Sequence, residues 1–151
     1  LPPPEKVQLN VKDAFEDVIK VASVGWDDKN ISLEYDVATD GLEISADQEM
    51  LEQMLINLMK NAEQALENVK EAKVKLSANL NKRGRIVLEV SDNGPGISEE
   101  LAAKIFVPFY TTKRDGSGVG LALTRQVMIA HGGSVSLTET EGGGATFNLT
   151  F

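Results

Sequence analysis

The amino-acid sequence predicts an α/β sandwich, in which helices cover one face of a mixed, largely antiparallel sheet. Two patterns lead to this class: short segments that alternate apolar and polar residues, and longer segments with apolar residues at helical spacing. Glycine-rich turns follow several of the short segments, as they do in antiparallel hairpins. A length of 151 residues fits a single core of ordinary size. We therefore expect one domain with about three helices and about five to seven strands.

The N-terminal part of the chain is expected to contain one helix and three short strands. The helix spans residues 12–24, with inward positions at Phe15, Val18, Ile19 and Ala22. The strands are expected at residues 7–11, 31–37 and 42–44. Trp26 follows the helix in a loop, where we interpret it as a packing residue, with contact to a partner protein as the alternative.

A second helix is predicted from Asp47 to about Asn68. Asp47 is a suitable N-cap, because its side chain can accept a hydrogen bond from the first turn, and Glu49 lies in that turn. Apolar residues recur on one face at Leu51, Met54, Leu55, Leu58, Ala62, Ala65, Leu66 and Val69. Asn57 and Asn61, four residues apart, border this apolar face. An amide pair in this position faces a cleft, unless both side chains are simply solvated.

The amide pair is also a candidate metal site. Magnesium typically takes one or two protein ligands and completes its shell with waters and substrate phosphates. The side-chain oxygens of Asn57 and Asn61 can supply such neutral oxygen ligands. The sequence therefore makes these two residues candidates for holding Mg²⁺.

The C-terminal half is expected to contain four strands and one helix. The strands are placed at residues 74–80, 86–90, 134–139 and 145–151, and the helix at about residues 119–130. Hairpin turns are expected at residues 81–84 and 142–144. His131, the only histidine, is interpreted as a C-terminal helix residue, where a partly cationic ring meets the negative end of the helix dipole.

The segment Ser91-Asp92-Asn93-Gly94-Pro95-Gly96-Ile97 has the pattern of a nucleotide pocket. A buried Asp at the end of a strand can accept a hydrogen bond from the exocyclic amine of adenine, and glycines let the backbone pass close to the ring. Guanine would instead present a carbonyl oxygen to the same carboxylate. An unpaired buried polar group costs about 1–3 kcal/mol, so the site would discriminate between the two bases. The alternative is an ordinary turn between a strand and a loop.

A second glycine-rich segment begins at Asp115 and runs Gly116-Ser117-Gly118-Val119-Gly120-Leu121. Two aromatic residues, two hydroxyls and a lysine precede it, at Phe109, Tyr110, Thr111, Thr112 and Lys113. The glycines come just before a predicted helix, whose N-terminal amides and dipole favour an anion. No acidic residue occurs from Gly116 to Ala130, although helices usually carry one in the first turn. This pattern indicates a phosphate site, with a flexible loop as the alternative.

Composition excludes several other functions. The chain has no cysteines, so it can form neither disulfides nor thiolate metal sites. Its net charge of −8 argues against nucleic-acid binding, which needs clustered cations. No apolar run approaches the roughly 20 residues of a membrane-spanning helix, and no signal peptide is visible. We expect a cytoplasmic domain without direct membrane contact, although its parent protein can be membrane-anchored.

Taken in order, these motifs resemble the catalytic and ATP-binding domain of two-component sensor histidine kinases, in the GHKL superfamily. The resemblance covers residues 6–151, or almost the whole chain. The matching motifs are the N box at residues 57–62, the first glycine box at 92–96, the F box at 106–109, the second glycine box at 116–120 and the ending at 144–147. Such a fold implies Mg-ATP binding at a site built from all of these motifs.

The resemblance also implies roles for single residues. Asn61 corresponds to the ligand that bridges Mg²⁺ to the phosphates, with Asn57 in support, and residues 98–117 resemble the ATP lid. Asp92 corresponds to the carboxylate that reads adenine, and Thr146 to a hydroxyl on the adenine side. The implied catalytic residues are Asn57, Asn61 and Lys113. The implied ATP-binding residues are Asn57, Lys60, Asn61, Asp92, Gly94, Gly96, Ile97, Phe109, Tyr110, Thr111, Thr112, Lys113, Gly116, Ser117, Gly118, Val119, Gly120, Leu121 and Thr146.

One position departs from the family pattern. Many members have a basic residue one turn after the magnesium-binding Asn, whereas this chain has Gln64. Lys60 or Lys113 can supply that charge.

The family's reaction transfers the γ-phosphoryl group of ATP to a histidine on a separate helical phosphoacceptor domain, which later passes it to a response regulator. His131 does not match that acceptor. Residues 1–6 are expected to be a proline-rich linker remnant and residues 7–151 the catalytic domain; a first residue Leu1 agrees with an excised fragment. We expect this fragment to be monomeric and its parent kinase to be a homodimer.

Two other functions stay open. The first is a GHKL ATPase or an anti-sigma serine kinase, in which the position of Asn57 is typically a glutamate that activates a nucleophile; an amide cannot act as that base. The second is a nucleotide-binding module that has lost catalysis, although Asn61, Asp92, Lys113 and the glycines are all present.

Overall fold

The computed structural model describes residues 1–108 and 120–151, and a five-stranded sheet forms its centre. The strand order is β2 (Ser32–Val37), β4 (Lys73–Leu80), β5 (Ile86–Asp92), β7 (Ala145–Thr150) and β6 (Ser134–Glu139). β2 runs parallel to β4, and the other three pairs are antiparallel. The prediction of a mixed, largely antiparallel sheet is confirmed.

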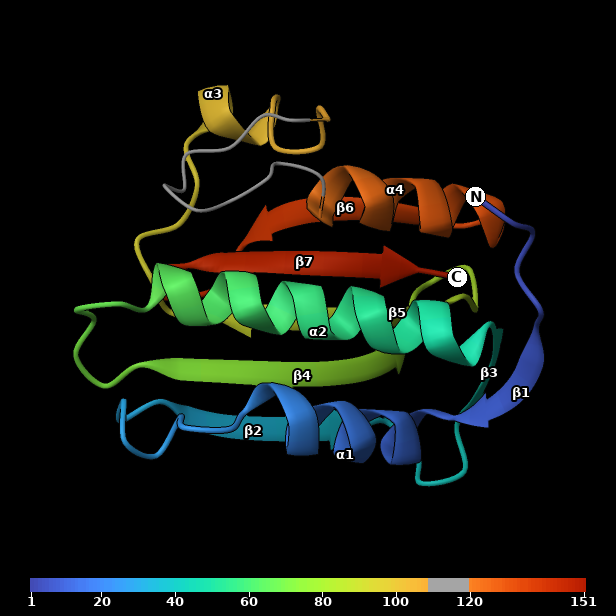
Figure 1. Ribbon diagram of the computed structural model, residues 1–151, viewed down its shortest axis with the longest axis horizontal. Helices are drawn as coiled ribbons and strands as arrows, with labels where there is room; N and C mark the ends of the chain where they lie inside the picture. The colour runs from blue at the N-terminus through green and yellow to red at the C-terminus, as the bar shows by residue number, and fades with distance from the viewer. Residues whose placement is uncertain (109–119) are drawn as a thin grey trace.

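Two further strands form a small sheet of their own. β1 (Val7–Asn10) pairs antiparallel with β3 (Glu43–Ala46), and this pair lies beside one end of the main sheet (Figure 1). The sequence predicted both strands but not that they separate from the others.

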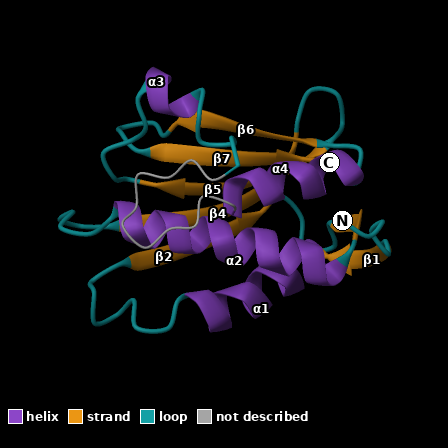
Figure 2. Cartoon of the chain, turned by 45° about the horizontal axis from the view of Figure 1, so that its top comes forward, coloured by secondary structure: helices purple, strands orange, loops and turns teal. Residues whose placement is uncertain are grey.

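Three helices cover one face of the main sheet (Figures 1 and 2): α1 (Val11–Ala22), α2 (Gln48–Ala65) and α4 (Gly120–Ala130). A short helix, α3 (Glu99–Ala102), lies apart from this layer. The largest fully buried side chains come from both layers and include Phe15, Ile44, Leu51, Leu55, Leu58, Met59, Leu76, Leu88, Met128 and Leu149. The opposite face of the sheet carries polar side chains such as Ser77, Glu89, Ser91 and Asn148. The sandwich with helices on one face is therefore confirmed.

Side-chain caps fix where the first two helices begin. The side chain of Asp47 accepts from the N–H of Met50 at 3.0 Å, which confirms Asp47 as the N-cap of α2. The side chain of Asn10 caps α1 in the same way through Asp13 at 2.9 Å, so α1 begins at Val11 rather than residue 12. Both caps satisfy amides that have no partner inside the helix.

Two element ends differ from the sequence prediction. α2 ends at Ala65, before the expected Asn68, whose φ of 67° lies in the left-handed region and cannot continue a helix. β5 continues past residue 90 to Asp92, because Asp92 still pairs with Val74 of β4. Asp92 is thus the last residue of a central strand. None of the helices in the described residues has the length and apolar character needed to cross a membrane.

Candidate functional site

Asp92 is a buried carboxylic acid at the end of β5. It is 6% exposed, and its Oδ1 accepts hydrogen bonds from the N–H groups of Gly94 at 2.9 Å and Ala145 at 3.3 Å. Burial raises the pKa of the Asp92 carboxyl, and these two donors oppose the rise without cancelling it. Both of these bonds fall on Oδ1, so Oδ2 can accept from an amine of a ligand.

Glycines bring backbone against Asp92. A Cβ on Gly94 would lie 3.0 Å from the carbonyl oxygen of Ala65, and a Cβ on Gly144 would collide with the carbonyl oxygen of Asp92. Gly96 and Gly144 also have positive φ values, of 78° and 117°. A side chain at Gly144 would displace the backbone around Asp92, and one at Gly96 would be strained by its positive φ. The end of α2, the glycine turn and the start of β7 therefore meet at Asp92.

Asn93 holds the glycine turn in place, a role that the sequence analysis missed. Its Oδ1 accepts from the N–H of Lys73 at 2.7 Å, and its Nδ2 donates to the carbonyl of Glu71 at 2.9 Å. The signal was present in the sequence, because Asn before Gly commonly bonds to nearby backbone in turns. Asn93 therefore ties the turn to the first residue of β4.

Asn57 lies against the first residue of α4. A Cβ on Gly120 would lie 2.6 Å from Oδ1 and 2.9 Å from Nδ2 of Asn57, so the Asn57 side chain could not keep this position beside a larger residue. Within the described ranges, the buried Nδ2 of Asn57 has no hydrogen-bond partner. An unpaired buried donor costs about 1–3 kcal/mol, and an anionic ligand would satisfy it. The first turn of α4 contains no acidic residue, which also favours an anion at this helix end.

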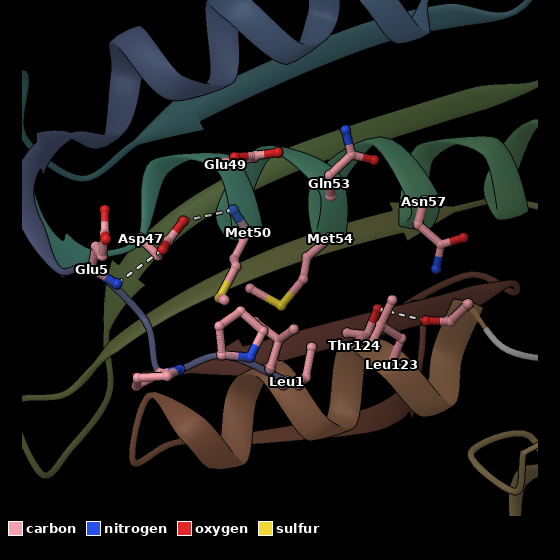
Figure 3. Close-up of a pocket in the computed structure, with 14 residues that line it drawn as sticks. Leu1, Glu5, Asp47, Glu49, Met50, Gln53, Met54, Asn57, Leu123 and Thr124 are labelled. Atoms are coloured by element: carbon pink, nitrogen blue, oxygen red, sulfur yellow. Dashed lines mark hydrogen bonds between the residues drawn. The ribbon is translucent and has the colours of Figure 1, made fainter.

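A cavity of about 580 Å³ lies between α2 and α4 (Figure 3). It is lined by Leu1, Pro2, Pro3, Glu5, Asp47, Glu49, Met50, Gln53, Met54, Asn57, Gly120, Leu123, Thr124 and Val127. In Figure 3 the side chain of Asn57 points from α2 towards α4. The cavity contains Asn57 and Gly120 but not Asp92, so it covers only one end of the site expected from the sequence.

The expected site residues that lie in the described ranges form two clusters along α2. Asn57 meets Gly120 in its middle, and Ala65 meets Gly94 and therefore Asp92 at its end. Asn61 lies between them and is half-buried. Of the other expected residues, Lys60 is exposed, while Ile97 and Leu121 pack against the core. The expected residues Phe109, Tyr110, Thr111, Thr112, Lys113, Gly116, Ser117, Gly118 and Val119 lie outside the described ranges.

Thr146 lies on the other face of the sheet. Ser91 pairs with Thr146 in the register of β5 and β7, and their hydroxyl oxygens are 2.9 Å apart. Because side chains alternate along a strand, Thr146 faces away from the helices, whereas Ala145 and Phe147 face towards them. This placement differs from the expected position on the adenine side. The residue of β7 that contacts the carboxylate of Asp92 is Ala145, through its N–H.

The candidate metal ligands are amides rather than carboxylates. No group of three or more His, Cys, Asp or Glu residues that could hold a metal ion occurs in residues 1–108 and 120–151. The buried Nδ2 of Asn57 has no partner in these ranges and lies beside a helix end that favours anions, so it would donate to a phosphate oxygen rather than ligate a cation. Magnesium here would be held by side-chain amide oxygens together with water and phosphate oxygens, as is usual for this ion.

His131 is buried at the end of α4, with both ring nitrogens engaged. Nε2 accepts from the N–H of Asp47 at 3.0 Å, and Nδ1 lies 2.8 Å from the carbonyl oxygen of Val127. With Nε2 as acceptor, Nδ1 carries the proton and donates. His131 therefore links the end of α4 to the N-cap residue of α2. Neither nitrogen is placed to attack a phosphoryl group.

Together, the fold and these contacts define an α/β sandwich with a candidate nucleotide site on its helical side. The family described as "Histidine kinase-, DNA gyrase B-, and HSP90-like ATPase" matches residues 46–151. The sensor histidine kinase ZraS of Salmonella typhimurium is 30% identical over 141 residues, which cover 93% of this chain and 30% of ZraS. This chain therefore spans less than a third of that relative's length.

Solved structures agree with this assignment. The catalytic domain of histidine kinase ThkA has a TM-score of 0.84 at 30% identity, covering 97% of this chain and 95% of that one. Full-length ShkA in complex with AMPPNP has a TM-score of 0.80 at 30% identity, covering 95% of this chain and 30% of that one. ThkA in complex with the response regulator TrrA gives a TM-score of 0.80 at 28% identity, covering 97% and 42%. This chain belongs to the family of histidine kinase-, DNA gyrase B- and HSP90-like ATPases, and its relatives are sensor histidine kinases.

Proposed function

We propose that this chain binds Mg-ATP along α2 and presents its γ-phosphoryl group to a histidine on a separate helical domain. The observation that carries the proposal is the unpaired buried amide of Asn57 at the acid-free start of α4. The buried carboxylate of Asp92 lies further along the same helix. An anion site and an acceptor for an amine, spaced along one helix, match the two ends of ATP.

Each candidate site residue in the described ranges has a distinct role in this proposal. Asp92 accepts from the exocyclic amine of adenine, and Gly94 and Gly96 allow the ring to approach the backbone. Asn57 and Asn61 hold the phosphate end, and magnesium bound there would neutralise phosphate charge. Gly120 and Leu121 set the helix end beneath the phosphates. Lys60 remains a candidate for the missing basic residue.

The residues outside the described ranges complete the proposed site. Lys113, Thr111 and Thr112 would approach the phosphates, Phe109 would anchor one end of the lid, and Tyr110 would be a further ATP-binding residue. Gly116, Ser117, Gly118 and Val119 would bring backbone amides to the phosphate chain.

Transfer to a histidine is proposed from the relatives. Phosphoryl transfer asks little covalent chemistry of the enzyme, which mainly positions the groups and neutralises charge. The amide of Asn57 cannot serve as a general base, which disfavours water as the acceptor. His131 is engaged at both nitrogens, so the acceptor would be supplied by another domain. We propose that residues 1–6 join that domain to residues 7–151, in a homodimeric cytoplasmic kinase that serves a response regulator.

Radiolabelled ATP tests this proposal in a protein that extends this chain over the full length of its relatives. We expect label on the protein through a bond that is stable in alkali and labile in acid, as a phosphohistidine is. Asn61→Ala should abolish the label, and Gln48→Ala, an exposed change on the same helix, should not. Steady release of phosphate without labelled protein would instead support an ATPase.

A further inference from the structure

A chain of three hydroxyl groups lies on the open face of the sheet, directly behind the candidate adenine site. The oxygens of Ser91 and Thr146 are 2.9 Å apart, and those of Thr146 and Thr140 are 3.0 Å apart. Thr140 then donates to the backbone carbonyl of Asp92 at 2.9 Å. The chain joins β5, β7 and the hairpin between β6 and β7, and Thr146 is buried within it.

The direction of these hydrogen bonds is fixed at one end. A carbonyl oxygen can only accept, so the single proton of Thr140 goes to Asp92. Thr146 must therefore donate to Thr140, and Ser91 must donate to Thr146. Hydrogen bonds that run in one direction polarise one another and strengthen the last bond. The whole chain therefore acts on one atom, the carbonyl oxygen of Asp92.

Thr140 also closes the hairpin that supplies a donor to Asp92. Its N–H donates to the carbonyl of Gly144 at 3.1 Å, and its carbonyl accepts from Gly143 at 2.9 Å. The next residue after Gly144 is Ala145, whose N–H donates to Oδ1 of Asp92. Thr140 thus fixes both the backbone of Asp92 and the strand that orients its carboxylate.

We propose that Thr140, supported by Thr146 and Ser91, is a positioning residue for base recognition by Asp92. The three hydroxyls lie on the face opposite the nucleotide and touch no ligand. They hold the carboxylate at the depth and angle that an adenine amine requires. This inference rests on the proposed nucleotide site and adds residues that determine its specificity.

Substitutions at Thr140 test the proposal with two readouts. Thr140→Val removes the donor at nearly constant shape, and Thr140→Ser keeps it. Thr140→Val should weaken ATP binding about three- to tenfold and Thr140→Ser should restore it. The preference for ATP over inosine triphosphate, which lacks the exocyclic amine, should fall with Thr140→Val. The matched control is Thr138→Val, an exposed threonine on the same face.

Amide hydrogen exchange gives the second readout and needs no nucleotide. Thr140→Val should speed exchange at the N–H groups of Gly94 and Ala145 about tenfold, because their acceptor Asp92 becomes less well held. Unchanged exchange at both amides, with an unchanged preference between the two nucleotides, would overturn the positioning role. Absence of ATP binding by the unsubstituted protein would overturn the proposed function instead, and exchange would still decide the role of Thr140.

Discussion

At the scale of single residues, the burial of Asp92 and its proposed role in binding an amine favour opposite protonation states of its carboxyl. Recognition of an amine favours the ionised carboxylate, whereas burial favours the neutral acid and raises its pKa. A pKa that is higher in the folded than in the unfolded state contributes stability at low pH, and this contribution is lost as pH rises through the folded-state value. Ionisation of Asp92 near neutral pH therefore lowers the stability of the folded protein.

Asp92→Asn should separate these two effects. Removing the charge should leave the unfolding midpoint at neutral pH unchanged or higher, because an ionised buried group is lost. ATP affinity should fall about ten- to hundredfold, the range for a hydrogen bond to a charged group. Thermal unfolding and nucleotide titration of the same sample measure both quantities. Equal losses of stability and binding would indicate that Asp92 is only structural.

Asn57 should contribute more to binding than to folding. Its Nδ2 has no partner in the described part of the chain, so Asn57→Ala removes no hydrogen bond of that group there. We expect ATP affinity in the presence of magnesium to fall about tenfold, with a small change in stability. Gln48→Ala, at an exposed position of the same helix, is the control. Unchanged affinity in Asn57→Ala would remove this residue from the site.

At the scale of elements, the hairpin between β6 and β7 depends on the close approach of Gly144 to the backbone of Asp92. Gly142 and Gly144 both have positive φ, of 87° and 117°, but only a Cβ on Gly144 would meet the backbone of Asp92. Gly142→Ala therefore adds conformational strain of about 1 kcal/mol, whereas Gly144→Ala adds a collision with β5. Chemical denaturation should show the larger loss for Gly144→Ala. Equal losses would mean that the hairpin can move away from Asp92.

The C-terminal half of α2 is tied to the loop after α1 by Glu63. Trp26, which is 2% exposed and so confirmed as a packing residue, donates from Nε1 to Glu63 at 2.8 Å. Burial acts to raise the pKa of Glu63, but hydrogen bonds from Lys29 and Trp26 outweigh it and lower the pKa. Ionised Glu63 therefore stabilises the folded protein at pH values above the ordinary Glu pKa of about 4.3. This contribution is lost as the pH falls through the lower pKa that Glu63 has in the folded state.

Fluorescence of Trp26, the only tryptophan, can follow this link. We expect acid to shift the emission as Glu63 takes up a proton, at a pH below that of an ordinary Glu. Glu63→Gln should remove most of this transition. Emission with the same acid dependence in both proteins would show that another group controls the environment of Trp26.

Element ends were the least predictable from sequence. Asp47 was found because an N-cap precedes a long periodic segment, but Asn10 was missed because it was assigned to the preceding strand. β5 extends to Asp92 because pairing with β4 overrides the low strand preference of Asp. The face of Thr146 could have been predicted, since Phe147 next to it must point into the core.

At the scale of the whole molecule, α2 relates the parts of the site to one another. Asn57 and Ala65 are eight positions apart, or about 12 Å along the helix. α4 contacts α2 at the first position and the glycine turn contacts it at the second. The sequence motifs singled out Asn57, Gly94, Asp92 and Gly120, and the structure brings Gly120 to Asn57 and Gly94 to Asp92. They could not predict the hydroxyl chain behind Asp92, which depends on the register of β5 against β7.

We propose above that this chain binds ATP at both ends of the nucleotide, the adenine at Asp92 and the phosphates at Asn57. Calorimetric titration with ATP and magnesium, with GTP as the control nucleotide, tests it most directly. We predict saturable ATP binding, little response to GTP, and no continuing heat of hydrolysis. Equal binding of ATP and GTP would contradict base recognition by Asp92, and no binding of either would contradict the nucleotide site itself.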